Sequence, residues 1–326
     1  MVDVVRMDPM GPLLCLLSAG GFGAMAIFGK FAYDAGVGVE DLLLLRFALA
    51  AVLLLSFAAA KGALRVVPRS SVLAGLGMGA LGYATQSGLY FCALERMDAS
   101  LLALILYVYP VLVLIGAVAL GRERASVRRV IALLIALTGA ALVLVGAASG
   151  SLDALGTVMG FGAAVAYTVY ILVGDRVGVG VPPVALSAFV CLGATCTFAL
   201  VSIVHGGPKL AFDADGWAWV IAIAVVSTVA AILCFFAGLA RVGPSAAAIL
   251  STLEPVVTVA LAGAAFGESL GAVQVVGGAL VIGAVLVMQW PKRRGGRLLY
   301  RGNETGVEFR QPLEATMRRV HGATET

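Results

Sequence analysis

Residues 93–123 read ALERMDASLLALILYVYPVLVLIGAVALGRE, and residues 238–268 read GLARVGPSAAAILSTLEPVVTVALAGAAFGE. The two stretches align without a gap at an offset of 145 residues. Identical residues recur at that offset, namely Leu94 and Leu239, Arg96 and Arg241, Ser100 and Ser245, Pro110 and Pro255, Glu123 and Glu268 and, further upstream, Gly29 and Gly174. A fixed period over apolar sequence predicts a duplicated fold whose two halves contain the same helices.

The composition indicates that this duplicated chain lies in a membrane. Hydrophobic residues make up 61% of the 326 residues and charged residues only 12%. A soluble protein cannot hide so much apolar surface, because its outside must face water. A membrane-spanning helix needs about 20 residues, and ten apolar runs can be delimited at 12–33, 41–60, 71–94, 99–120, 128–147, 154–174, 183–204, 216–239, 245–266 and 270–290. We therefore predict an all-α integral membrane protein with ten transmembrane helices, five in each repeat.

The charged residues predict the orientation of the helices. With a cytoplasmic N-terminus, only Lys30, Arg96 and Lys209 lie outside, Arg46 lies within a span, and all other Lys and Arg residues lie inside. The positive-inside rule therefore favours a cytoplasmic N-terminus and C-terminus. Five helices per half make the second half enter from the opposite side, which predicts inverted-topology repeats at 11–147 and 153–290. Residues 291–326 form a basic and polar cytoplasmic tail.

Several function classes lack the motifs that they need. The chain has no phosphate-binding G-x-x-x-x-G-K loop, and its histidines, His205 and His321, lie in an outer loop and in the tail. With no intramembrane Asp pair, Ser–His pair or metal-ligand cluster, we expect no enzyme activity, metal or cofactor. The five cysteines fall inside predicted spans and are interpreted as packing residues. The basic clusters indicate topology and contact with lipid headgroups, not nucleic-acid binding. The preference for Arg over Lys and the abundance of Ala, Gly and Val are typical of a GC-rich bacterial genome, so we expect a bacterial plasma (inner) membrane.

Small residues mark where helices could approach closely. The fifth span carries Ala132, Ala136 and Ala140 on one face, and the tenth carries Ala279 and Gly283. Such faces let helix backbones approach each other in lipid. Two interpretations stay open, contact of each helix with its own half in a monomer, or a homodimer interface through the fifth and tenth helices.

Glu254 is the strongest single candidate for a functional residue. It lies about nine residues into the ninth span, roughly 14 Å along a helix and therefore near the midplane of a ~30 Å hydrocarbon core. A carboxylate there costs about 3 kcal/mol on insertion scales and normally faces a cavity or a partner. Pro255 removes a backbone donor and frees carbonyls near Ser251, so Pro255 and its counterpart Pro110 are expected to kink their helices. Glu254 could carry a proton, bind a substrate amine or make a structural hydrogen bond between helices.

Polar and aromatic side chains on several spans point to a cavity for a small amphipathic molecule. They are Tyr83, Gln86, Ser87 and Tyr90 on the third span, Tyr107 and Tyr109 on the fourth, Tyr167, Thr168 and Tyr170 on the sixth, Ser227 and Thr228 on the eighth, and Ser251 on the ninth. Hydroxyls that only bond neighbouring helices are the alternative for each residue. Arg46, about five residues inside the second span, could pair with a carboxylate, bind an anionic substrate group or extend to the outer headgroups.

This pattern resembles the EamA-type members of the drug/metabolite transporter superfamily. In that family a Pro in the middle of the fourth helix precedes a Gly-x-Glu or nearby Glu at its end, and a small residue and a Gly follow in the fifth. The chain reads Tyr109-Pro110…Gly121-Arg122-Glu123…Ala132…Gly139 in its first half, Glu254-Pro255…Gly267-Glu268…Gly277 in its second, and Arg46-Phe47 in the second helix. The resemblance covers about 11–290 and departs at Ala132, where the family often has Gly.

The resemblance implies secondary-active transport, without ATP, of small organic solutes such as amino acids, other metabolites or drugs. It also implies a central cavity lined by the first four helices of each half, and proton-coupled export is the form that we expect. Glu254 and the tyrosine-rich walls favour a cationic or zwitterionic solute. The alternative is a non-transport membrane sensor or scaffold that reuses the fold, with a passive channel between the two. A polar cavity that contains Glu254 would favour transport.

Overall fold

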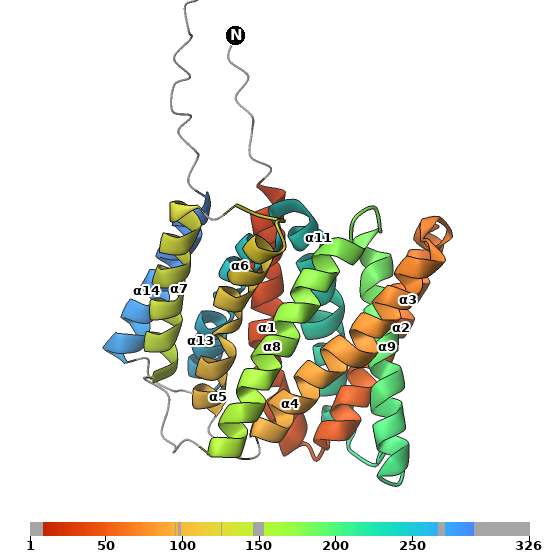
Figure 1. The fold of residues 1–326 in the computed structure, drawn as a ribbon. Helices are drawn as coiled ribbons and strands as arrows, with labels where there is room; N and C mark the ends of the chain where they lie inside the picture. The colour runs from red at the N-terminus through yellow and green to blue at the C-terminus, as the bar shows by residue number, and fades with distance from the viewer. Residues whose placement is uncertain are drawn as a thin grey trace, which may run out of the picture. The chain divides into compact units, whose positions relative to one another are not determined.

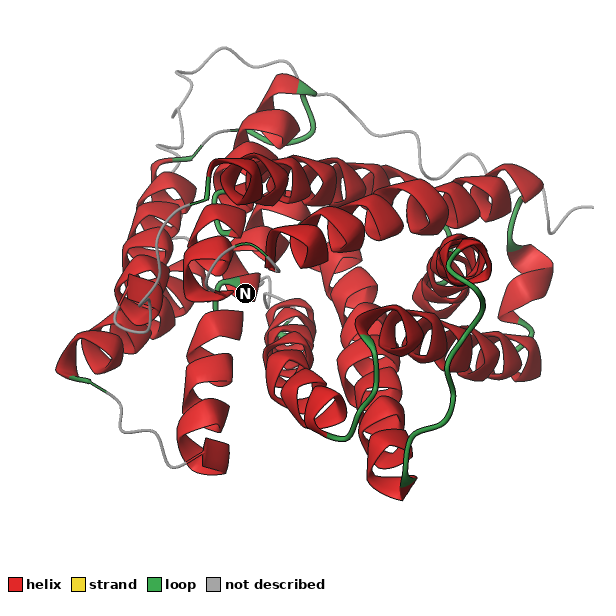
Figure 2. Ribbon diagram, turned by 90° about the horizontal axis from the view of Figure 1, so that it is seen from below, coloured by secondary structure: helices red, strands yellow, loops and turns green. Residues whose placement is uncertain are grey.

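The computed structural model describes residues 9–94, 96, 99–124, 126–145, 153–266 and 271–289, and every regular element in them is helical (Figures 1 and 2). The described helices belong to one compact unit. In chain order they are α1 (Met10–Asp34), α2 (Val39–Ala60), η1 (Ala63–Val66), α3 (Arg69–Gly77), η2 (Met78–Tyr83), α4 (Ala84–Leu94), α5 (Ala99–Leu106), α6 (Tyr109–Ala119), α7 (Val127–Val145), α8 (Ala154–Val177), α9 (Pro183–Val204), α10 (Ala214–Ala222), η3 (Ile223–Ala230), α11 (Ala231–Val242), α12 (Pro244–Ser251), α13 (Glu254–Phe266) and α14 (Ala272–Gln289). The tail expected at 291–326 lies outside the described residues.

The prediction of an all-helical membrane protein is confirmed. Among the described residues, eight helices are long and apolar enough to cross a membrane. The remaining two predicted spans are the third, which consists of α3, η2 and α4, and the tenth, which is α14. The resulting number of spans is consistent with two repeats of five helices. Large apolar side chains face outward, for example Leu81 at 73% and Val158 at 69% exposure. Such a surface is stable only where the surroundings are themselves apolar.

The two halves share the same irregularities at the same offset. A π-helical segment, η2, begins at Met78 in the third span, and its counterpart η3 begins at Ile223 in the eighth. The fourth span breaks between α5 and α6, directly before Pro110, and the ninth breaks between α12 and α13, directly before Pro255. Because proline has no N–H, the carbonyl four residues earlier loses its helical partner and the helix can turn there. The repeat therefore extends from sequence identity to helix geometry.

The fifth and tenth spans pack against each other within one chain. Helices α7 and α14 lie side by side at one edge of the bundle, away from α2, α3 and α9 (Figure 1). A Cβ atom on Gly139 would lie 2.6 Å from the carbonyl oxygen of Gly277, and a Cβ on Gly277 would lie equally close to that of Gly139. Both helices also contact their own half, α7 against α5 and α14 against α12, as the monomer interpretation expects. A homodimer through these helices would have to use their other faces.

Candidate functional site

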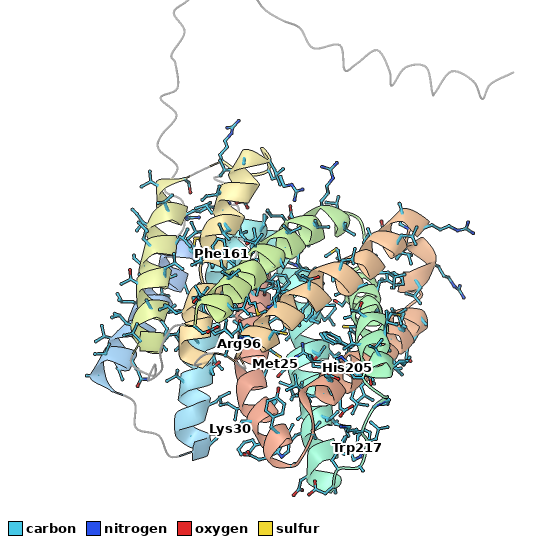
Figure 3. All side chains as sticks on the ribbon, turned by 60° about the horizontal axis from the view of Figure 1, so that its bottom comes forward. Met25, Lys30, Arg96, Phe161, His205 and Trp217 are labelled. Carbon is cyan, nitrogen blue, oxygen red and sulfur yellow. The ribbon has the colours of Figure 1, made fainter. Side chains whose placement is uncertain are left out.

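A cavity of about 290 Å³ lies between the two repeats, in the half of the bundle where α1 ends and α2 begins. The first half contributes lining residues from α1, α2, α4, α5 and α7, and the second half from η3 and α13. These residues are Phe22, Met25, Gly29, Tyr33, Leu42, Arg46, Tyr90, Ala103, Leu106, Tyr107, Leu144, Ile223, Glu254, Pro255, Thr258 and Val259. Figure 3 shows Met25 within the bundle, viewed with this end turned forward. The cavity thus depends on both copies of the repeat.

A smaller cavity of about 70 Å³ adjoins the first and is more polar. Arg46, Tyr90, Tyr107 and Glu254 border both cavities. The smaller one adds Tyr83, Gln86, Ser87, Tyr109 and Tyr167. Most of the candidate residues expected from the sequence therefore surround one continuous space. A polar recess beneath a wider apolar chamber can orient a small molecule through a few hydrogen bonds.

Glu254 is placed in this space by the break in the ninth span. It is the first residue of α13, after the turn at Thr252 and Leu253 that follows α12. Tyr107, in the turn at the matching break of the fourth span, borders both cavities together with Glu254. Both polar groups are therefore presented by interrupted helices, one from each repeat. Broken helices at the centre of a membrane protein are tolerated where they face a cavity.

Helix α1 fixes the position of Glu254 from the other side. The Thr258 hydroxyl lies within hydrogen-bonding distance of two carbonyl oxygens, that of Gly23 at 2.9 Å and that of Glu254 at 3.1 Å, and its single proton is shared between them. Gly23 has no room for a side chain, because a Cβ atom there would lie 2.8 Å from the Glu254 carbonyl oxygen. The backbones of α1 and α13 are consequently in direct contact at the level of the site.

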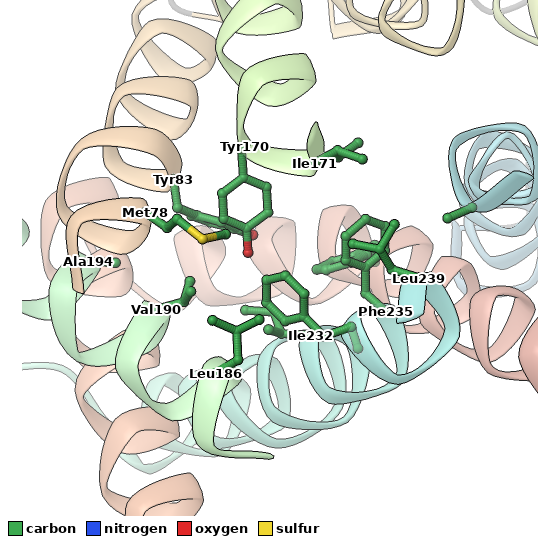
Figure 4. Packing of buried hydrophobic residues seen from close by; sticks show 14 of the residues in the cluster. Met78, Tyr83, Tyr170, Ile171, Leu186, Val190, Ala194, Ile232, Phe235 and Leu239 are labelled. Carbon is green, nitrogen blue, oxygen red and sulfur yellow. The ribbon is translucent and has the colours of Figure 1, made fainter. Parts of the chain in front are cut away.

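Two expected site residues support the cavity without lining it. Tyr170 packs edge-on against Tyr83, with ring centroids 5.5 Å apart, and stacks against Tyr167 at 6.2 Å. Ser251 is the buried last residue of α12, the helix whose Ala248 carbonyl oxygen accepts a hydrogen bond from the Tyr109 hydroxyl at 3.5 Å. Tyr109 and Tyr167 are themselves 4.6 Å apart. Figure 4 shows Tyr83 and Tyr170 beside each other above apolar side chains that include Ile232 and Phe235. These residues hold the aromatic wall in place.

Arg46 points into the protein and not toward the surrounding lipid. The residue is 3% exposed, its guanidinium lies 4.4 Å from the centroid of the Phe47 ring, and it borders the smaller cavity together with Tyr83. Its Nη1 atom lies 2.7 Å from the sulfur of Met25. The interpretation that this side chain extends to the outer headgroups is therefore wrong, since its head is enclosed by protein.

The first span contributes more of the site than its sequence indicates. Phe22, Met25 and Tyr33 line the main cavity from α1, yet this helix carries no polar stripe. Only a comparison of the two halves could have predicted Phe22 and Met25, because they are equivalent to Tyr167 and Tyr170, 145 residues further along the chain.

The Ser227 and Thr228 pair of the eighth span does not border either cavity. The Thr228 hydroxyl instead donates a hydrogen bond to the Ile223 carbonyl at 3.0 Å inside η3.

Two ion pairs lie at the face of the bundle where α1 begins. Arg122, after α6, pairs with Asp175 near the end of α8 at 3.5 Å and donates a hydrogen bond to the Leu172 carbonyl. Glu123 pairs with Arg129 at the start of α7 at 3.0 Å. The Arg122 contacts join the two repeats. Beside them lies a separate cleft of about 270 Å³, bordered by Gly174, Asp175, Gly178, Val179, Gly180, Val181, Pro183, Leu186, Phe236, Leu239 and Ala240.

These features define a multi-pass membrane protein of the transporter class, with a solute-sized cavity between two inverted repeats. The model of the EamA-like transporter family matches residues 9–145 and 154–290, so the chain belongs to this family and is not an enzyme. An uncharacterised transporter of Archaeoglobus fulgidus is 27% identical over 212 residues, 65% of this chain and 74% of the relative. The uncharacterised transporter YcbK of Bacillus subtilis is 24% identical over 310 residues, 90% of this chain and 97% of the relative. A solved crystal structure shares the fold with a TM-score of 0.74 at 22% identity, over 86% of this chain and 96% of that one.

Proposed function

We propose that this chain is a secondary-active exporter of small organic solutes that exchanges solute for protons at Glu254 by alternating access. The observation that carries the proposal is the position of Glu254, at a helix break and in a cavity built from both repeats. We further propose a bacterial plasma membrane with both termini cytoplasmic, which makes the cavity outward-facing. The sensor or scaffold alternative receives less support, because a bundle that only supports other proteins has no need for this polar cavity.

Glu254 can couple the two fluxes because one carboxylate serves two competing cations. An enclosed carboxylate without a cation is unfavourable in a site that excludes most water, so the group either carries a proton or binds a positively charged part of the solute. Binding of a solute ammonium group releases the proton to water in the cavity, and protonation releases the solute. Tyr107 borders the same cavities, and a hydrogen bond from its hydroxyl would hold the carboxyl in one orientation through both states. Solute and protons are then exchanged one for the other, provided that the conformational change occurs only when the Glu254 carboxyl carries a proton or binds a solute cation.

The conformational change can be an exchange of shape between the repeats. Gly29 and Met25 line the open cavity, and their counterparts are Gly174, at the cleft on the opposite face, and the buried Tyr170. If the halves exchange conformations, the core around Tyr170 opens and the cavity around Met25 closes. The Arg122–Asp175 pair would separate in that step.

The lining residues favour amines and zwitterions, including amino acids and lipophilic drugs, as the solutes. Tyrosine and phenylalanine rings supply apolar faces that attract cations, and Glu254 supplies the matching charge. Among the described residues that line the cavities, Arg46 is the only arginine or lysine, whereas a nucleotide sugar would need several cations.

Solute efflux from liposomes tests the proposal. Liposomes that contain the full chain are loaded with a mixture of amino acids and amines, and the external solution is made acidic relative to the lumen. Mass spectrometry of the external solution then identifies solutes that leave faster than from protein-free liposomes. Release of a few related cationic or zwitterionic solutes, driven by the proton gradient, is expected. Release of none above the protein-free rate would contradict transport and favour the sensor or scaffold alternative.

A further inference from the structure

The guanidinium of Arg46 is a buried charge without an anionic partner. Within the described parts of the chain, no ion pair joins Arg46 to a carboxylate, and its buried Nε atom has no hydrogen-bond partner. Its other contacts are a phenol, an aromatic ring and a thioether, none of which carries a negative charge. A buried cation in a membrane protein normally pairs with an anion, because removal from water is costly otherwise.

Arg46 and Glu254 have no charged counterparts in the repeat. At the repeat offset of 145 residues, Arg46 is equivalent to Cys191 and Glu254 is equivalent to Tyr109. The shared scaffold of the two halves therefore requires neither charge. Both charges nevertheless border the same two cavities, on helices from different halves, and no ion pair joins them.

The geometry points to Arg46 as the binding site for a carboxylate of the solute, with Glu254 at the other end of the same molecule. This inference rests on the proposed transport function and narrows it to small zwitterions, molecules that carry one carboxylate and one ammonium group. The planar guanidinium suits a carboxylate because its N–H groups can donate two parallel hydrogen bonds, one of them from the unpartnered Nε. The Tyr83 hydroxyl borders the same recess as the guanidinium and would help to keep the fork in place. The rest of the solute would occupy the apolar chamber.

Matched sets of ligands separate the two charges. Binding to the purified full chain in nanodiscs is measured for leucine and phenylalanine, for their decarboxylated amines (3-methylbutylamine and 2-phenylethylamine), and for their deaminated acids (4-methylpentanoate and 3-phenylpropionate). We expect the zwitterion of at least one set to bind about 10-fold or more tightly than either partner, since each charge-assisted hydrogen bond contributes substantially. Arg46→Gln should weaken zwitterion binding by about 10-fold or more and change amine binding by no more than about 3-fold.

Two further variants test whether Arg46 binds the solute or only stabilises the fold. Arg46→Lys keeps the charge and should retain part of the preference for zwitterions, although its single ammonium cannot replace the fork. Arg69→Gln removes an exposed cation at the start of α3 and should change nothing. Equal loss of zwitterion and amine binding in Arg46→Gln would overturn the assignment, as would the failure of every zwitterion to bind better than its amine. Amines that still exchange for protons would then leave the proposed transport function standing.

Discussion

Gly23 on α1 lies directly against Glu254 on α13, so close that a Cβ atom on Gly23 would be 2.8 Å from the Glu254 carbonyl oxygen. The first half of the chain thus sets the position of the carboxylate that the second half supplies. A residue that forms no part of the cavity wall therefore controls the geometry of the site.

Gly23→Ala should displace α13 and impair transport. The added methyl group meets backbone, which cannot rotate away, so we expect a destabilisation of about 1–3 kcal/mol together with a loss of activity. Thermal unfolding and solute efflux of the same preparation measure both effects. Gly20→Ala on the same helix is the matched control, because no atom lies within 4 Å of its Cβ position. Equal behaviour of the two variants would refute the contact.

Tyr107→Phe should weaken solute–proton exchange while leaving the fold intact. The variant keeps the ring and removes only the hydroxyl that we expect to bond Glu254 in the shared cavity, a loss of about 1–3 kcal/mol and hence of roughly 5- to 150-fold in the rate or affinity that depends on it. Tyr33→Phe removes a hydroxyl elsewhere in the same cavity and should have a smaller effect. The rate of proton-driven efflux compares the two, and a larger loss in Tyr33→Phe would count against the assigned role of Tyr107.

Ala103 and Ala248 offer a direct test of alternating access. They occupy equivalent places in the repeats, but Ala103 lines the open cavity whereas Ala248 is fully buried. In a background without the native cysteines, Ala103→Cys should react with a membrane-impermeant thiol reagent from the face where the cavity opens. Ala248→Cys should react only from the opposite face, and faster during solute exchange. Reaction of both from one face under all conditions would contradict the exchange of shape.

Asp175→Asn should favour the state that is open at the face where α1 begins. The substitution removes the charge that pairs with Arg122 across the repeats. Both side chains are partly exposed, so the expected shift in free energy is at most about 1 kcal/mol, or roughly 5-fold in the population of the other state. The labelling rate of Ala248→Cys reports that population. An unchanged or slower rate in the double variant would show that the pair does not hold this face closed.

The fold could be predicted largely from the sequence, because hydropathy shows the spans and the identical residues of the two halves show the repeat. Apolar runs mark the spans, and proline marks the breaks before Pro110 and Pro255. The π-helical segments at Met78 and Ile223 could not be found this way. They depend on packing between distant helices, for instance where Gly79 lies against the backbone at Val190.

The site was only partly predictable for the same reason. The stripe of Tyr83, Gln86 and Tyr90 has helical spacing, and its residues do line the cavity. The sequence left three interpretations of Arg46 open, since depth in a helix says nothing about which neighbours enclose the side chain. Small residues on α7 likewise indicate that a helix approaches closely, but not that the partner is α14. Tertiary packing decides which helices contact each other across the repeats, and the sequence of a single helix does not encode that packing.

The central claim, that Glu254 couples solute to protons, is tested most directly with a pH dye trapped in proteoliposomes. Addition of an exported solute at the face where the cavity opens should change the lumenal pH in the wild type. Glu254→Gln should abolish this response, while Glu40→Gln, which removes an exposed carboxylate paired with His205, should keep it. A response that survives in Glu254→Gln at the wild-type rate would contradict the claim and assign Glu254 a structural role.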